Sequence, residues 1–326
     1  MEPPLSSGKL VTVFGGSGFL GRYVVQALAK RGHRIRVAVR RPDLAGHVQP
    51  LGAVGQIKPI QANVRYRWSV DRAVAGADAV VNLVGILFEA GRQTFDAVQA
   101  FGPRAVGEAA REAGILNVVH VSAIGTDQPS TIGYIRSKAD GEAAIRDAMP
   151  TAVIMRPSIV FGPEDNFFNR FAAMARISPL LPLIGGGLTR FQPVFAGDVG
   201  EAIARAIDGE ARPGTIYELG GPEILTFRQC MERMLEVTRR RRMLLPIPWG
   251  AARLMGRVGQ LMPGRPITVD QVRMLQFDNI VSDEAKRDGR TLEGLGIDPT
   301  ALEIVLPTYL VRFRERGEFT PPSAAP

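Results

Sequence analysis

Short apolar, β-branched runs alternate with longer amphipathic stretches through the first half of the chain. The stretches, such as GRYVVQALAKRG and RAVGEAAREAG, repeat apolar residues at helical spacing and end at glycine, so they predict helices. Strands that alternate with helices form right-handed crossovers and a parallel sheet covered on both faces. The pattern therefore predicts an α/β fold with a doubly wound parallel sheet. Its strands are predicted at Leu10–Phe14, Arg34–Val39, Ile57–Gln61, Ala79–Val84, Val118–Ser122 and Ala152–Arg156.

The pattern loosens after about residue 163, where SPLLPLIGGGLTRFQPV is rich in proline and glycine. A strand-like run, GTIYELGG, follows at residues 214–221, and from Thr226 the chain reads as helices joined by turns that contain proline. We predict a sheet domain at residues 1–165 that is completed by about residues 190–221. Residues 166–189 and 222–326 then form a smaller, mainly helical lobe.

The composition narrows the class of protein. No apolar run approaches the ~20 residues that a membrane-spanning helix needs. A single cysteine, Cys230, excludes disulfides and Cys-based metal sites and indicates a reducing environment. The histidines His33, His47 and His120 share no metal-ligand spacing, so we expect no metal.

The net charge of +8 is carried almost entirely by arginine. Such a surplus favours an acidic protein surface, an anionic lipid or a nucleic acid as partner, because the summed surface potential steers association. The sequence has no zinc-finger or helix-turn-helix spacing and no basic stretch interleaved with aromatics. We therefore expect no nucleic acid among the partners.

A glycine-rich stretch, VTVFGGSGFLGR, joins the first predicted strand to the first predicted helix. Gly15, Gly18 and Gly21 allow a tight turn there, and they let the helix N-terminus approach a pyrophosphate with no side chain between. A lone glycine run is a weak signal, but the strand before it and the helix after it are what the motif requires. The stretch predicts a dinucleotide-binding sheet of Rossmann type.

Two arginines, Arg40 and Arg41, follow the second predicted strand in RVAVRRPD. An acidic residue at this place usually holds the ribose 2′-hydroxyl of NAD. A guanidinium suits the extra 2′-phosphate of NADP, which a carboxylate would repel. The arginines favour NADP(H) as the cofactor, and the alternative is that they only line a solvated strand end.

Further motifs resemble the extended and atypical branch of the short-chain dehydrogenase/reductase family. They are GGSGFLG, NLVG at 82–85, YIRSK at 134–138, RPSIVFGP at 156–163 and PVFAGDVGEAI at 193–203. The resemblance spans residues 10 to about 221 and implies a cofactor site. It is formed by Gly15, Ser17, Gly18, Phe19, Leu20, Gly21, Arg40, Arg41, Asn63, Val64, Leu83, Val84, Gly85, Tyr134, Lys138 and Pro157.

The same resemblance implies a catalytic trio of Ser122, Tyr134 and Lys138. Tyr134 and Lys138 are four apart and share a helix face, where the charge of the lysine would lower the pKa of the phenol and make it a general acid or base. Ser122 would polarise the substrate oxygen. Ser122 and Tyr134 are only twelve positions apart, whereas the family usually inserts a longer, pocket-forming loop there. The trio is therefore either catalytic or vestigial, with Tyr134 and Lys138 anchoring only the ribose.

A second departure from the family lies at Asn63, where an acidic residue commonly faces the adenine. The amide of Asn63 can still bond the adenine edge, so we expect nucleotide binding to survive.

A closer resemblance is to the NADPH-binding accessory subunits of respiratory complex I, the NADH:ubiquinone oxidoreductase. It rests on residues 11–43, on HVSAIG, and above all on ITVDQVRMLQFDNIVS at 267–282, which ordinary reductases lack. It implies a tightly held nucleotide that serves structure, other complex I subunits as partners, and no catalysis by this chain itself. With no leader pattern at its start, we expect a peripheral protein on the cytoplasmic side of a bacterial inner membrane, or on the matrix side if the chain is a mature organellar one.

The C-terminal lobe carries a candidate docking surface between Thr226 and Ser282. A run of four arginines, Arg239–Arg242, precedes an apolar stretch, a combination that suits a membrane surface or a partner's groove. The alternative is that the apolar residues pack internally while the arginines are solvated. The apolar residues are Trp249, Leu254, Met255, Leu261 and Met262.

Three functions remain open. The first is an NADP(H)-binding accessory subunit of complex I, with a role in assembly or stability. The second is a free-standing NADPH-dependent reductase of a carbonyl or quinone, which steady turnover would reveal. The third is a regulatory protein that senses NADPH, which partner binding that depends on the NADPH/NADP ratio without turnover would reveal.

Overall fold

The computed structural model describes residues 8–126, 132–260 and 267–315. The chain divides into two compact units, each formed from three segments. The sheet unit comprises 1–158, 196–220 and 281–299, and the small unit comprises 159–195, 221–280 and 300–326.

The sheet unit is built on a seven-stranded sheet with the order β11-β6-β5-β4-β1-β2-β3, in which every neighbouring pair is parallel. The strand order reverses between β1 and β4, which is the switch point where open α/β sheets bind ligands. The predicted doubly wound sheet of Rossmann type is therefore confirmed. Its strands are β1 (Leu10–Phe14), β2 (Arg34–Val39), β3 (Ile57–Gln61), β4 (Ala79–Asn82), β5 (Asn117–Val121), β6 (Val153–Pro157) and β11 (Ile216–Leu219).

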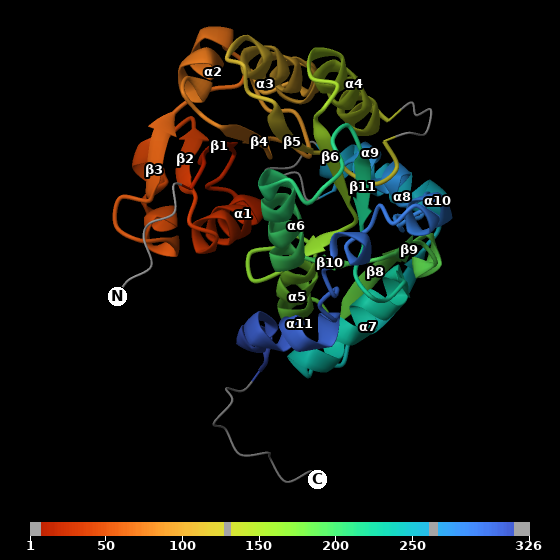
Figure 1. The fold of residues 1–326 in the computed structure, drawn as a ribbon. Helices are drawn as coiled ribbons and strands as arrows, with labels where there is room; N and C mark the ends of the chain where they lie inside the picture. Colours follow the sequence, from red (N-terminus) through yellow and green to blue (C-terminus); the bar gives the residue numbers. More distant parts are fainter. Residues whose placement is uncertain (1–7, 127–131, 261–266, 316–326) are drawn as a thin grey trace, which may run out of the picture. The chain divides into compact units, whose positions relative to one another are not determined.

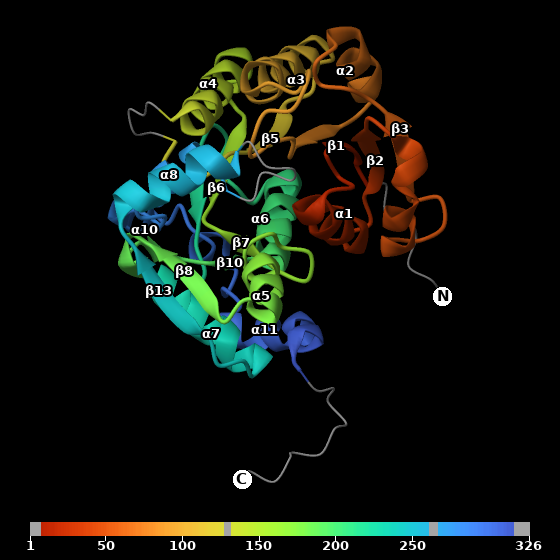
Figure 2. The same cartoon turned by 180° about the vertical axis from the view of Figure 1, so that it is seen from behind.

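Helices cover both faces of this sheet (Figures 1 and 2). One face carries α1 (Phe19–Lys30) and α6 (Ala196–Asp208), and the other carries α2 (Arg67–Val74), α3 (Phe101–Glu112) and α4 (Gly133–Ala148). Helices α1 and α6 pack closely against each other. A Cβ added at Gly200 of α6 would lie only 2.9 Å from the backbone carbonyl of Tyr23 in α1.

The core under α3 is formed by apolar residues of the strands. Successive side chains of a strand point to opposite faces of the sheet, and these residues point to the face that α3 covers. Phe14, Val80, Val118 and Ile154 are at most 1% exposed and belong to one cluster with Val106 of α3. Burying each such side chain contributes about 1.5–3 kcal/mol. Because of this alternation, the positions of the strands can be predicted from the sequence.

β5 and β6 are each shifted by one residue from the predicted strands, and two larger differences occur. β4 ends at Asn82 rather than Val84, because the side-chain oxygen of Asn82 accepts the N–H of Val84 and turns the chain out of the sheet. Residues 281–299, which include α10 (Asp283–Arg287), group with the sheet unit rather than with the helical lobe. The reason is that Glu218 of β11 donates its N–H to the carbonyl of Arg290, and its carboxylate accepts the N–H of Ser282. The division into functional domains stays a prediction.

The small unit contains five helices within the residues described. They are α5 (Phe168–Ile177), α7 (Phe227–Thr238), α8 (Trp249–Gly259), α9 (Val269–Met274) and α11 (Leu302–Leu310). Three two-stranded sheets accompany them. These pair β7 (Val160–Phe161) with β10 (Val194–Phe195), β8 (Leu180–Ile184) with β13 (Met243–Ile247), and β9 (Arg190–Phe191) with β12 (Leu225–Thr226).

Phenylalanine rings fill the core of the small unit. Phe161, Phe168 and Phe227 are at most 2% exposed, and Phe167 meets Phe168 edge to face with 5.0 Å between ring centroids. Beside them the buried carboxylate of Asp165 accepts the hydroxyl of Tyr309 at 2.5 Å, and burial raises its pKa. Within the described ranges, no helix combines the length and the apolar character that crossing a bilayer requires.

Candidate nucleotide site

The glycine stretch forms the turn that leads from β1 into α1. Gly15 has a φ of +80°, which glycine adopts without strain, and its carbonyl accepts the N–H of Gly18 at 3.1 Å. A Cβ at Gly21 would lie only 2.4 Å from that same carbonyl oxygen. Glycine at 15 and 21 therefore lets the helix start directly against the turn.

The N-terminus of α1 is left open to an anion. Gly18 is its N-cap, no side chain caps the helix, and no acidic residue lies in its first turn. The first N–H groups of a helix have no partner within the helix, and together with the helix dipole they attract phosphate. A Cβ at Gly18 would meet only the backbone oxygen of Gly15, at 3.3 Å, so no other atom crowds this position. The geometry fits a dinucleotide pyrophosphate.

The two arginines after β2 are not equivalent. Arg41 is exposed and gives its Nε and Nη2 to the carboxylate of Asp43, with the closest contact at 2.8 Å. Arg40 is also exposed, and within the described part of the chain it has no ion pair. Of the two arginines, Arg40 is therefore the one whose guanidinium is not already paired with a carboxylate.

Sequence reasoning missed one residue beside the glycine turn. The Nε2 of His47 lies 3.1 Å from the carbonyl oxygen of Ser17, and its Nδ1 lies 3.1 Å from that of Leu44. Nothing in the spacing of His47 along the chain connects it to residue 17. It ties the turn to the segment that follows Arg40 and Arg41.

Asn63 and Val64 follow β3, where the adenine edge was expected. The side-chain oxygen of Asn63 already accepts the backbone N–H of Arg65 at 3.2 Å, so its amide nitrogen is the group left for a base. Val64 is 6% exposed and packs against Gly102, where an added Cβ would lie 3.2 Å from the side chain of Val64. The pair thus offers one amide donor beside an apolar surface.

The NLVG segment links the glycine turn to α4. A Cβ at Gly15 would lie 3.4 Å from the backbone of Leu83 and Val84, and a Cβ at Gly85 would lie 3.2 Å from the Nζ of Lys138. Residues far apart in the sequence are therefore brought together at the carboxyl ends of β1 and β4. Pro157, at the end of β6, is also buried.

The expected trio lies at the end of β5 and on α4. Ser122 follows β5 directly, and its buried hydroxyl is one of the groups that hold the pKa of Glu142 below its usual range. The Nζ of Lys138 donates to the carbonyl of Val121 at 3.2 Å. The ring of Phe95 meets that of Tyr134 edge to face at 6.1 Å.

The expected effect of Lys138 on the tyrosine is wrong in this structure. Burial raises the pKa of Tyr134 to about 12, and burial also lowers the pKa of Lys138 to about 8. Desolvation disfavours the charged form of each group. It is the only cause of the shift at Tyr134, and at Lys138 it outweighs the opposing effect of the Glu142 charge. The phenol of Tyr134 is thus neutral near pH 7, able to donate a proton but not to act as a base.

A histidine lies under this site without acting in it. His120 of β5 pairs with Asn82 of β4, with 3.2 Å between Nδ1 and the amide nitrogen. Burial and the nearby charge of Lys138 lower its pKa to about 3, so the ring is neutral. Across the described ranges, no three His, Cys, Asp or Glu side chains gather as a metal site would require.

Helix α4 is fixed to the sheet by a buried ion triad. Arg156 of β6 donates from Nε and Nη2 to the carboxylate of Glu142 at 3.0 and 2.7 Å, and its Nη1 lies 4.0 Å from Glu218 of β11. The three side chains are at most 8% exposed. Burial alone would raise the pKa of Glu142, but the hydrogen bonds from Arg156 hold it below its usual range.

The candidate docking stretch is partly exposed. Trp249 packs on Gly185, where a Cβ would lie 2.2 Å from the indole ring. On α8, Leu254 and Met255 are 62% and 39% exposed. Leu261 and Met262 lie outside the described residues.

The fold and the glycine turn define a dinucleotide-binding protein of Rossmann type. The chain belongs to the NAD dependent epimerase/dehydratase family, whose profile matches residues 11–220.

Proteins that are similar in sequence along nearly the whole chain narrow the class of protein further. It is 35% identical over 323 residues to "NADH dehydrogenase [ubiquinone] 1 alpha subcomplex subunit 9, mitochondrial" of Arabidopsis thaliana, covering 95% of this chain and 79% of that one. It is 34% identical to the protein of the same name from Rattus norvegicus, covering 94% and 81%. The resemblance to complex I subunits is therefore confirmed.

Two other proteins are similar over less of the chain or in fold alone. "Ceramide reductase" of Caulobacter vibrioides is 35% identical over 175 residues, which is 54% of each chain. The NADPH-dependent quinone oxidoreductase of Escherichia coli, solved with NADPH, superposes with a TM-score of 0.70 at 19% identity, covering 93% of this chain and 99% of that one.

We predict that Gly21→Ala abolishes nucleotide binding, because the added Cβ collides with the Gly15 carbonyl and displaces the turn. Titration calorimetry with NADPH should show affinity reduced by at least about 100-fold. Gly18→Ala is the matched control, with a loss of at most about tenfold. Its Cβ meets the same oxygen at 3.3 Å, a tight contact that a much smaller shift relieves. Equal losses in both variants would contradict the packing role of Gly21.

We predict that Arg156→Met destabilises the protein by about 3–5 kcal/mol, because it leaves two carboxylates buried without their cation. Urea unfolding followed by circular dichroism measures this loss. Adding Glu142→Gln to the same variant should restore part of the stability by removing one buried charge. A loss below about 1 kcal/mol, typical of a surface pair, would show that the triad is dispensable.

Proposed function

We propose that this chain is an NADP(H)-binding accessory subunit of respiratory complex I, in which the nucleotide mainly stabilises the subunit. The observation that carries the proposal is that the relatives named as complex I subunits match 95% and 94% of the chain, including the part beyond the 11–220 family match. That part contains ITVDQVRMLQFDNIVS. The partners are then the other subunits of the complex.

The site supports a structural role for the nucleotide. The neutral phenol of Tyr134 lies against Phe95, and Lys138 is bonded to the Val121 carbonyl. In this arrangement the two side chains serve to hold the nicotinamide ribose. The glycine turn and the N-terminus of α1 hold the pyrophosphate.

NADP(H) is the proposed form of the cofactor, and Arg40 is its selector. The family description and the E. coli structure refer to NAD and NADPH respectively, so they leave the choice to the residues of this chain. Arg40 has no ion pair in the described chain, whereas Arg41 is engaged by Asp43.

The proposed location is peripheral, on the membrane face that carries the hydrophilic part of the complex. That is the cytoplasmic side in a bacterium and the matrix side in a mitochondrion, and the relatives from Arabidopsis and rat are named as mitochondrial. Exposed Leu254, Met255 and Val258 on α8 support a docking role for the segment Thr226–Ser282.

A reductase is the second candidate, and the protonated phenol of Tyr134, on the helix that also carries Lys138, favours it. The cofactor, when bound, would supply a hydride to a carbonyl carbon. Tyr134, which is protonated near pH 7, would then donate its proton to the carbonyl oxygen. The partial match to a ceramide reductase supports this alternative. An NADPH-sensing protein remains the third.

We predict that Arg40→Asp lowers the affinity for NADPH by about tenfold to a hundredfold, because it replaces a charge-assisted bond by repulsion of the 2′-phosphate. Titration calorimetry should show NADH binding unchanged. Arg41→Gln is the control, with a smaller loss, since Arg41 already pairs with Asp43. An Arg40→Asp variant that binds NADPH as the parent does would remove Arg40 from the site.

We predict that NADPH raises the melting temperature without enzyme-like turnover. A ligand that binds only the native state at 100 times its Kd adds about 2.7 kcal/mol of stability. Tyr134→Phe should keep this rise, because the ring still packs. Turnover of a carbonyl, ceramide or quinone substrate near ~10 per second that is lost in Tyr134→Phe would overturn the proposal in favour of the reductase.

A further inference from the structure

The four consecutive arginines divide into two pairs. Arg240 donates from Nε to the carbonyl of Phe313 at 2.7 Å, and Arg242 donates from Nε to that of Ala175 at 2.7 Å. Both also reach the carboxylate of Glu315, at 2.9 and 3.3 Å. Their side chains are only 7% and 20% exposed, so this pair ties the end of α7 to the rest of the small unit.

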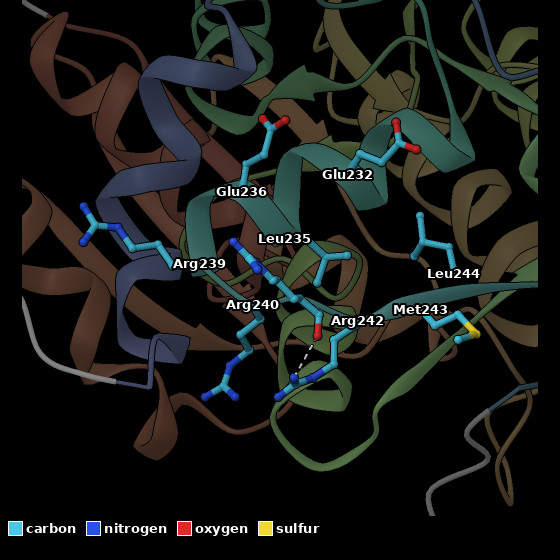
Figure 3. Close-up of a pocket in the computed structure, with 9 residues that line it drawn as sticks. Glu232, Leu235, Glu236, Arg239, Arg240, Arg242, Met243 and Leu244 are labelled. Atoms are coloured by element: carbon cyan, nitrogen blue, oxygen red, sulfur yellow. Dashed lines mark hydrogen bonds between the residues drawn. The ribbon is translucent and has the colours of Figure 1, made fainter. Parts of the chain in front are cut away.

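Arg239 and Arg241 have no such role. Both are exposed, and within the residues described neither has an ion pair or a side-chain hydrogen bond. Arg239 is the left-handed C-cap of α7, with a φ of +52°, and the chain leaves the helix there. In Figure 3 the side chains of Arg240 and Arg242 extend to the same side, and Arg239 extends in another direction.

The alternation of side chains along an extended chain explains why the four arginines divide into two pairs. It also places exposed apolar residues beside one of these pairs. From residue 240 the chain runs extended into β13, so successive side chains face opposite ways. Arg241, Met243 and Leu245 are on the exposed face, and the two apolar residues are 66% and 40% exposed. Leu180 of β8 pairs with Met243 in register and is 41% exposed. Two unpaired cations therefore lead directly into exposed apolar side chains.

An open hollow of about 800 Å³ lies at this place, between the last turns of α7 and the start of β13 (Figure 3). Glu232 and Glu236 also line it. Arg228 lies 3.9 Å from Glu232, whereas Arg233 lies 4.0 Å from Glu236 but only 2.7 Å from Glu303. Because four arginines and two glutamates line the hollow, it keeps a positive excess.

We propose that this surface docks on a bilayer that contains acidic phospholipids. Arg239 and Arg241 bind the lipid phosphates, and Met243, Leu245 and Leu180 enter the boundary between headgroups and acyl chains. A guanidinium binds phosphate with two parallel hydrogen bonds, and methionine adapts to an irregular apolar surface. A cationic rim beside exposed apolar residues is the composition that interfacial binding requires.

This inference rests on the proposed function, because a membrane-associated complex places the chain beside a bilayer. The exposed apolar strip favours lipid over an acidic protein, which the two arginines alone would not distinguish. An acidic protein partner is therefore an outcome that the test must separate.

The test measures sedimentation of the full chain, loaded with NADPH, with vesicles of phosphatidylcholine alone or with about 30% phosphatidylglycerol. We expect binding only to the acidic vesicles. Arg239→Gln with Arg241→Gln should weaken it about thirtyfold, and the loss should shrink as salt rises. The matched control is Arg104→Gln with Arg111→Gln on α3, which removes the same charge and should change binding by less than about threefold.

Further variants separate docking from folding. Met243→Ser with Leu245→Ser should weaken vesicle binding about tenfold at any salt concentration, with an unchanged melting temperature. Arg240→Gln with Arg242→Gln should lower the melting temperature instead, because that pair is structural. Vesicle binding that is independent of phosphatidylglycerol, or unchanged in Arg239→Gln with Arg241→Gln, would overturn the proposal.

Purification of the complex from detergent-solubilised membranes tests the proposed function separately. A chain that copurifies with complex I through Arg239 and Arg241 but ignores protein-free vesicles refutes the lipid surface and makes the partner an acidic protein. A chain that binds acidic vesicles as expected but never copurifies with complex I supports the lipid surface and refutes the subunit role.

Discussion

The buried charge of Arg156 is the constraint on which the sheet unit depends. A guanidinium taken out of water costs several kcal/mol unless carboxylates surround it, and here Glu142 and Glu218 supply them from α4 and β11. Glu218 in turn accepts the N–H of Ser282, which brings residues 281–299 back to the sheet. Three segments that are distant in the sequence must therefore assemble together, or a charge is left unpaired.

That constraint also decides the chemistry of the site. Because Glu142 fixes α4 against the sheet, Lys138 on the same helix is held in a buried position and Tyr134 in a half-buried one. Burial raises the pKa of the tyrosine and lowers that of the lysine. A pair of this kind can orient a ribose and donate a proton, but it generates no phenolate at neutral pH. The sequence motif alone gives the residues and their common face, and the packing around them sets their protonation.

Much of the sheet unit could be predicted because its signals are local. Apolar alternation places the strands, and the glycine turn between β1 and α1 is required by one close approach, that of Gly21 to the Gly15 carbonyl. The contact of His47 with Ser17 and the pairing of Arg41 with Asp43 could not be predicted. Each depends on where a loop returns in space, and neither spacing nor composition records that. The grouping of residues 281–299 with the sheet unit depends in the same way on contacts with distant segments. The carboxylate of Glu218 accepts the N–H of Ser282, and Arg205 and Arg212 donate to the carbonyls of Leu295 and Asp288.

The arginine run shows why charge counted along a sequence differs from charge presented on a surface. Four identical residues in a row look like one basic patch. A helix ends at Arg239 and an extended segment begins, so alternation turns Arg240 and Arg242 toward backbone carbonyls and Glu315. Only Arg239 and Arg241 keep their charge available. Arg241 also stands on the face that exposes Met243 and Leu245. The change from helix to strand therefore halves the basic patch, and it places part of what remains beside an apolar strip. A continuous helix through the same residues would have spread the arginines around its axis, with no such strip beside them.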